Sequence, residues 1–159
     1  GPHERDYYLM VKSIAQGFDF SVGYRRQLLT FVYVKDLASA VFDALESGVR
    51  RKSYLLTDGK TYTQSEFRSI VKHLLGKRFV VPVKAPLWIV GIVCAIAERI
   101  AAAKGKASTL NRDKYKILRQ RNWTCDITPA VNDFGYHPRY DLRQGLEETI
   151  RWYRDNGWL

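Results

Sequence analysis

The sequence predicts a single α/β domain that is mostly helical with short strands, and three observations support this fold class. Segments with helical periodicity alternate with short β-branched or aromatic runs, as in layered α/β or α+β domains. The 159 residues are 46% hydrophobic, which is enough to bury one sizeable core. Aromatic residues are spread along the chain and low-complexity runs are absent, so we expect residues 1–159 to fold as one domain.

The first third of the chain predicts a helix, two strands and a second helix. Residues 4–16 place apolar side chains on one helical face and end at a glycine. Residues 18–22 alternate like a strand, and after the basic loop GYRRQ the run LLTFVYV at 28–34 is typical of a buried strand. Asp36 is the predicted N-cap of the following helix. Its apolar face comprises Leu37, Ala38, Val41, Phe42 and Leu45.

The middle of the chain predicts a strand, a turn and a capped helix. Residues 52–57 have the composition of a short strand, and Asp-Gly at 58–59 predicts a turn. Thr63 and Glu66 have the spacing of a capping box, so they predict a helix that begins there and continues to Leu75.

An unusually apolar segment follows a predicted strand at 79–83. Pro86 suits the first turn of a helix, and the apolar run at 85–97 covers 13 residues. That run is shorter than the roughly 18 to 20 residues needed to cross a bilayer. We therefore predict a buried core helix, with a membrane-surface helix or a lid over an apolar ligand as the alternative.

Residues 104–121 carry seven basic residues and one acid, in a chain whose net charge is +10. This charge favours an anionic partner such as nucleic acid, a phosphorylated ligand or a membrane surface. Leu110, Ile117 and Leu118 recur at helical spacing, so the basic side chains belong to a solvent-facing side. Tyr115 is the only aromatic residue there that could stack on a base, so we do not expect nucleic acid as a partner.

The C-terminal segment predicts a strand and two helices. Residues 122–127 resemble a strand, and Thr128, followed by Pro129, is the predicted cap of a short helix that ends at Gly135. Asp141 is the predicted cap of the last helix. Its buried side comprises Leu142, Leu146, Thr149, Ile150 and Tyr153.

The residues alone indicate no catalytic constellation and no metal site. The three histidines are scattered, and Cys94 and Cys125 have no metal-ligand spacing. Two such thiols are typical of reduced structural cysteines, which predicts a cytoplasmic protein. The chain begins GPHERDYYLM, without an initiator methionine or secretory leader, so we expect it to be cut from a longer protein. Gly1 and Pro2 are either native or left by a protease.

Three stretches of the sequence carry a resemblance to a known family: LLTFVYVKDLASAVFDALES, SYLLTDGKTYTQSEF and CDITPAVNDFGYHPRYDLRQGLEETIRWY. In this order they resemble the C-terminal, substrate-binding half of extended short-chain dehydrogenase/reductases, the NAD-dependent epimerase/dehydratase family. The resemblance implies an enzyme that uses NAD or NADP in its full-length form. In the family, the glycine-rich fingerprint and the Tyr-x-x-x-Lys catalytic pair lie upstream of the Tyr-Gly-Pro motif, so the resemblance places both outside this sequence. We therefore expect the fragment alone to bind no cofactor, to contain no catalytic residue and to be inactive.

The resemblance also implies binding residues. The initial Gly-Pro would end the family's Tyr-Gly-Pro motif, which places Pro2 and His3 near the nicotinamide. The expected substrate-binding residues are Tyr7, Tyr8, Met10, Phe31, Tyr33, Trp88, Arg119 and Arg121.

One departure from the family bears on the substrate. Sugar-nucleotide epimerases of the family carry an Arg-Asp pair where this chain has Leu29 and Thr30. The paired hydrogen bonds from that arginine to the diphosphate are therefore not possible at this position. Arg25 and Arg26, or the arginines at 119 and 121, would have to compensate. The apolar segment is similar to that of 3-beta-hydroxysteroid dehydrogenases and flavonoid reductases. This favours an apolar alcohol or ketone as the small-molecule substrate, with a sugar-type substrate as the alternative.

Two further expectations concern partners. In the family, the FDALES helix and the SYLLT strand pack on the Rossmann layer, and without that layer their apolar surface would be exposed or covered by self-association. We therefore expect a homo-oligomer. A basic binding module for nucleic acid or an anionic membrane surface is the alternative function, so peripheral membrane contact stays open. A regulatory remnant that has lost its cofactor is a third option.

Overall fold

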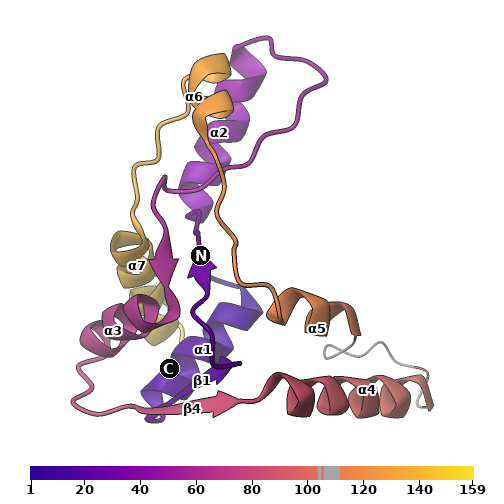
Figure 1. Cartoon of the computed structure of the whole chain (residues 1–159). Coiled ribbons are helices and arrows are strands. Elements are labelled where there is room, and N and C mark those ends of the chain that lie inside the picture. The colour runs from indigo at the N-terminus through magenta and orange to yellow at the C-terminus, as the bar shows by residue number, and fades with distance from the viewer. Residues whose placement is uncertain (104, 106–111) are drawn as a thin grey trace.

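The computed structural model describes residues 1–103, 105 and 112–159, and it shows a mixed α/β chain dominated by helices (Figure 1). This agrees with the predicted fold class. In chain order the elements are α1 (Arg5–Ala15), β1 (Phe18–Val22), β2 (Leu28–Leu29), α2 (Val34–Glu46), β3 (Tyr62–Thr63), α3 (Gln64–Leu74), β4 (Val81–Ala85), α4 (Leu87–Ala103), α5 (Arg112–Leu118), α6 (Thr128–Phe134) and α7 (Leu142–Asp155).

The strands of the described residues form two small sheets. β1 pairs in parallel with β4, and Phe18 lies opposite Val81 at the start of the ladder. β2 pairs antiparallel with β3, and Leu28 lies opposite Thr63. Each sheet joins segments that are far apart in sequence, so the sheets fix the loops that follow their strands.

The main core lies where α1, α3 and α7 pack together, at the lower left of Figure 1. Its buried residues are Val11, Ile14, Phe67, Val71, Leu142, Leu146, Ile150 and Tyr153. The buried side predicted for the last helix is confirmed in full, since Thr149 is also buried. A smaller cluster of Ala40, Ala130 and Tyr136 joins α2 to α6 at the far end of the molecule.

The predicted caps at Thr63 and Asp141 are confirmed, but the one at Thr128 is wrong, because Thr128 is the first residue of α6 and the N-cap is Ile127. Thr63 and Glu66 form a reciprocal capping box at the start of α3. Asp141 and Gln144 form a second one at the start of α7. α6 ends at Gly135, whose φ of 71° is left-handed and therefore suits glycine.

Three predicted strands are wrong in whole or in part. The run at 28–34 forms a strand only at Leu28 and Leu29, and α2 already begins at Val34. Residues 52–57 form no strand, and 122–127 contribute only a single bridge, between Leu28 and Asn122. A β-branched and aromatic composition favours extended backbone, but a strand also needs a neighbouring backbone for its hydrogen bonds. The described residues offer these segments no such continuous neighbour.

The predicted role of Asp36 as an N-cap is also wrong. Asp36 lies inside the first turn of α2, and the N-cap is Tyr33, which makes no side-chain capping bond. The Asp36 side chain is 3% exposed and instead accepts the backbone N–H groups of Arg139 (3.1 Å) and Tyr140 (3.0 Å). It stabilises a loop that is about 100 positions away, which local sequence cannot reveal.

The apolar segment forms a helix as predicted, but its predicted burial is wrong. Cys94 is the only buried residue of α4, while Trp88 is 67% and Ile92 53% exposed. No helix of the described residues is long and apolar enough to cross a membrane. Of the basic segment, 104 and 106–111 lie outside the described residues. The apolar face of α2 is exposed too, since Phe42 is 66% and Leu45 73% accessible.

Candidate functional site

An open cleft of about 1170 Å³ is the candidate site among the described residues. It forms where the loop after β1, the start of α4, helix α5 and the segment 119–122 meet. Its lining includes three arginines and three aromatic residues, and we call it the arginine cleft. These six residues are Arg25, Arg119, Arg121, Tyr24, Trp88 and Tyr115.

Gln27 anchors one wall of this cleft. Its side-chain amide donates hydrogen bonds to the carbonyl oxygens of Leu118 (2.9 Å) and Gln120 (2.8 Å). The Leu28 N–H then donates to the carbonyl oxygen of Arg121 at 2.8 Å. Because these bonds hold the backbone around Arg119 and Arg121 against β2, both guanidinium groups are carried to the cleft.

Two glycines let the other walls approach each other. Gly23 has a φ of 76°, a left-handed conformation that turns the chain at the end of β1. Its N–H donates to the carbonyl oxygen of Ala85 at 2.8 Å, at the end of β4. On α4, a Cβ atom at Gly91 would lie 3.4 Å from the Tyr115 ring, so the absent side chain lets α5 pack closely on α4.

The cleft has the groups that recognise a nucleoside diphosphate. Guanidinium groups bind phosphate oxygens with paired, charge-assisted hydrogen bonds, and aromatic rings stack on bases. Tyr24 is 68% and Trp88 67% exposed, and Arg119 and Arg121 are exposed as well. No aspartate or glutamate lines the cleft in the part of the chain that the structure describes. The cleft is therefore positively charged and suited to an anion that carries a flat ring.

We predict that Gln27→Ala loosens the arginine cleft without unfolding the protein. The change removes two hydrogen bonds to backbone carbonyls, each contributing about 0.5 to 1.5 kcal/mol. We expect the free energy of unfolding to fall by about 1 to 2 kcal/mol in urea denaturation. Gln64→Ala is a matched control, because its amide makes a single bond, to the Phe20 carbonyl at 3.2 Å. An equal loss in both variants would contradict the anchoring role of Gln27.

A second, smaller hollow of about 70 Å³ lies beside the main core. Gly1, Tyr7, Phe31 and Tyr33 contribute to its lining. Its volume has room for a few water molecules only. On α7, a Cβ atom at Gly145 would lie 2.9 Å from the Tyr33 ring, so this glycine lets the ring pack directly on the helix. The hollow is therefore a gap in packing between α1 and α7, too small for a substrate.

Tyr33 has a structural partner at this hollow. Its hydroxyl donates to Glu148 at 2.8 Å, and Lys35 forms an ion pair with the same carboxylate at 2.7 Å. Burial, followed by the hydrogen bond to Glu148, raises the pKa of Tyr33 to about 12. The phenol is neutral at physiological pH and acts as a hydrogen-bond donor.

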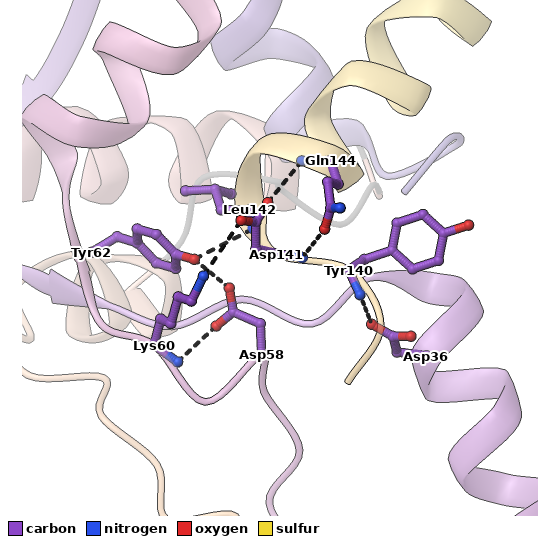
Figure 2. A network of polar contacts seen from close by, with 8 residues as sticks. All are labelled: Asp36, Asp58, Lys60, Tyr62, Tyr140, Asp141, Leu142 and Gln144. Atoms are coloured by element: carbon purple, nitrogen blue, oxygen red, sulfur yellow. Dashed lines mark hydrogen bonds and ion pairs between the residues drawn. The ribbon is translucent and has the colours of Figure 1, made fainter. Parts of the chain in front are cut away.

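A polar network ties the turn before β3 to the start of α7 (Figure 2). Asp58 accepts the Lys60 N–H at 3.0 Å and the Tyr62 hydroxyl. Burial, and then this bond to Asp58, raises the pKa of Tyr62. Lys60 reaches Asp141 at 3.4 Å, and the Tyr62 oxygen accepts the Leu142 N–H at 3.4 Å. These carboxylates hold backbone and side chains of the same chain, so we assign the network a structural role.

The structure brings six of the eight predicted substrate-binding residues to two places. Trp88, Arg119 and Arg121 line the arginine cleft together. The predicted residues at the smaller hollow are Tyr7, Phe31 and Tyr33. Sequence reasoning had selected Trp88 for its position on an apolar helix and the arginines for their charge, and it did not place them in one cleft.

The other predicted binding residues, Pro2, His3, Tyr8 and Met10, do not line either of these two hollows. Tyr8 donates its hydroxyl to the Trp158 carbonyl at 2.8 Å, and Met10 packs against the main core. The His3 ring lies 4.5 Å from the Trp152 ring, and Pro2 precedes it. The cofactor contacts expected of Pro2 and His3 stay predictions.

Tyr24, Gln27 and Tyr115 were missed as site residues. The signal in the sequence was the basic loop GYRRQ directly after a strand, because polar loops at strand ends often carry binding residues. Among the described residues, no group of three or more His, Cys, Asp or Glu side chains could hold a metal ion.

Comparison with known proteins finds sugar-nucleotide enzymes among the relatives of the chain. No family model matches the chain. An uncharacterized protein, y4nL, of Sinorhizobium fredii is 26% identical over 94% of this chain and 43% of its own length. UDP-glucuronate 4-epimerase 6 of Arabidopsis thaliana is 26% identical over 96% of this chain and 31% of its own length. The chain thus spans less than half the length of these relatives.

Solved structures share the fold at low sequence identity. The dTDP-glucose 4,6-dehydratase of Bacillus anthracis in complex with NAD matches 94% of this chain and 39% of its own, with a TM-score of 0.65 and 21% identity. The closer likeness to 3-beta-hydroxysteroid dehydrogenases stays a prediction. The sequence relatives and the shared fold confirm the resemblance carried by the motifs: the chain is similar to the C-terminal part of NAD-dependent epimerases and dehydratases of the extended short-chain dehydrogenase/reductase type.

Proposed function

We propose that this chain binds the substrate of an NAD(P)-dependent epimerase, dehydratase or dehydrogenase, and that the substrate is a sugar attached to a nucleoside diphosphate. The observation that carries the proposal is the gathering of Arg25, Arg119 and Arg121 with exposed aromatic rings in one cleft. A sterol-like alcohol or ketone, which the apolar helix α4 favours at the level of sequence, offers no anion for three guanidinium groups. The relatives whose names specify a substrate act on UDP-linked or dTDP-linked sugars.

In this proposal the arginines hold the diphosphate and an aromatic ring stacks on the base. The sugar then extends from the cleft, and the nicotinamide of the intact enzyme supplies the hydride chemistry at a hydroxyl or keto group. No glycine-rich dinucleotide loop occurs in the sequence, so in this proposal the rest of the intact enzyme holds the cofactor. The chain's own contribution is therefore to bind and orient the substrate. The inactivity of this part alone, its homo-oligomeric state and its cytoplasmic location stay predictions.

Calorimetric titration of the intact protein tests the proposal. We expect UDP or dTDP to bind about 100-fold more tightly than uridine or thymidine, because each charge-assisted hydrogen bond contributes about 1.5 to 3 kcal/mol. Equal affinity for nucleoside and nucleoside diphosphate would contradict the assignment of the arginines. Binding of a sterol alcohol in place of both would favour the apolar substrate.

We predict that Trp88→Ala weakens substrate binding without loss of stability. Stacking of a base on an aromatic ring contributes about 1 to 3 kcal/mol, so KM should rise about tenfold or more. Phe79→Ala is the matched control, since Phe79 is 85% exposed and does not line the arginine cleft. An unchanged KM in Trp88→Ala would remove this residue from the site.

A further inference from the structure

Helix α4 has an exposed apolar surface that the proposed function does not use. It contains 17 residues, so it is about 25 Å long. In Figure 1 it continues from β4 away from α1, α3 and α7, with α5 beside it. The exposed fractions of five aliphatic side chains along it lie between 38% and 53%: Ile89, Ile92, Val93, Ile96 and Ile100. An exposed apolar surface of this extent marks an interaction site.

The same region is strongly basic. The described residues of the segment 84–121 include seven lysines or arginines and two acids, a net charge of +5 in a chain whose net charge is +10. Two ion pairs, between Arg112 and Glu98 (3.5 Å) and between Lys116 and Asp113 (2.9 Å), leave this excess in place. Arg99, at the outer half of α4, is exposed. We call residues 84–103 and 112–121, which contain α4 and α5, the basic apolar arm.

Exposed aliphatic side chains together with positive charge indicate which kind of partner binds this surface. A second copy of the arm would bring two strongly positive segments together, which is unfavourable. Nucleic acid would satisfy the charge, but aliphatic side chains have no favourable contact on a phosphate backbone. An anionic bilayer satisfies both requirements, because its interface accepts aliphatic side chains and its headgroups attract lysine and arginine.

We propose that the basic apolar arm docks on the surface of a bilayer that contains anionic lipids, with α4 lying in the plane of the interface. A surface orientation agrees with the length of α4, because no described helix is long and apolar enough to span a membrane. The inference rests on the exposed arm, and its test does not depend on which substrate the protein binds.

Vesicle sedimentation of the intact protein tests this docking. We expect binding to vesicles of phosphatidylcholine with about one-third phosphatidylglycerol, little binding to pure phosphatidylcholine, and a loss of binding in high salt. Ile92→Asp with Ile96→Asp should lower the partition coefficient at least about tenfold, because burial of two aliphatic side chains is lost. Arg99→Glu with Lys116→Glu should lower it about tenfold through the charge alone.

The controls separate docking from misfolding. Both positions of each double variant are exposed, so we expect an unchanged Tm and circular dichroism spectrum. Phe79→Asp is the matched control, because Phe79 is exposed beside Lys77 and Arg78 but lies outside the arm, and it should bind vesicles like the unaltered protein. The proposal is overturned if anionic vesicles do not bind the protein, or if both arm variants still bind. It is also overturned if the Ile92 and Ile96 changes dissociate a dimer, since a second copy then covers α4.

Discussion

Replacing Arg119 and Arg121 together by alanine is expected to weaken UDP or dTDP binding by about 100-fold or more. Both residues are exposed, and the backbone that carries them is held against β2 by Gln27 and Leu28. Each guanidinium that contacts a diphosphate contributes about 1.5 to 3 kcal/mol, and about 1.4 kcal/mol corresponds to a factor of ten. Titration calorimetry of the intact protein measures the change directly.

Two further variants show whether the effect is specific to the arginine cleft. Arg151→Ala removes an exposed arginine of α7, paired with Glu147 at 3.5 Å and absent from the cleft lining, and should leave affinity unchanged. Exchange of Arg119 and Arg121 for lysine keeps the charge but loses the paired hydrogen bonds, so affinity should recover only in part. If the double alanine variant binds UDP and dTDP with unaltered affinity, the diphosphate does not occupy this cleft.

Asp36→Ala is expected to lower the free energy of unfolding by about 2 to 4 kcal/mol. The side chain is 3% exposed and accepts two backbone N–H groups, from Arg139 and Tyr140. Alanine leaves both donors without their acceptor, and each buried unsatisfied group costs about 1 to 3 kcal/mol. Urea denaturation of the intact protein gives the value.

The size of this loss distinguishes a long-range contact from an ordinary cap. A helix N-cap replaced by alanine costs typically about 1 kcal/mol, so a loss of that size would speak against the two loop contacts. Asp43→Ala is the control on the same helix, because Asp43 is exposed, and we expect a change within about 0.5 kcal/mol. Asp36→Asn retains an acceptor oxygen and should recover part of the loss.

The sequence by itself determined the features whose physics is confined to a few neighbouring residues. The capping boxes of α3 and α7 were predictable, because the side chain and the backbone N–H that it accepts are three residues apart. The buried side of α7 was predictable for the same reason, since helical periodicity alone places Leu146, Ile150 and Tyr153 on one face. The ordered motifs also sufficed to indicate the resemblance to epimerases and dehydratases that the relatives share.

The strands show where this local reasoning ends. Residues 52–57 and 122–127 have strand composition, yet a strand exists only where a second backbone supplies hydrogen bonds. The prediction that α4 is buried was wrong for a related reason. The apolar composition of a helix predicts that it will be covered, but the covering surface is a property of the whole assembly.

Only the tertiary structure decided which residues form the site. The types of Trp88, Arg119 and Arg121 were informative in the sequence, but their meeting depends on the two carbonyl bonds of Gln27 and on the close packing that Gly91 permits. The Gln27 bonds join residues that are 91 and 93 positions apart in the sequence. The physical reason is that local sequence specifies the conformation of each segment, while the position of a site depends on which segments find one another's hydrogen-bonding groups and apolar surfaces.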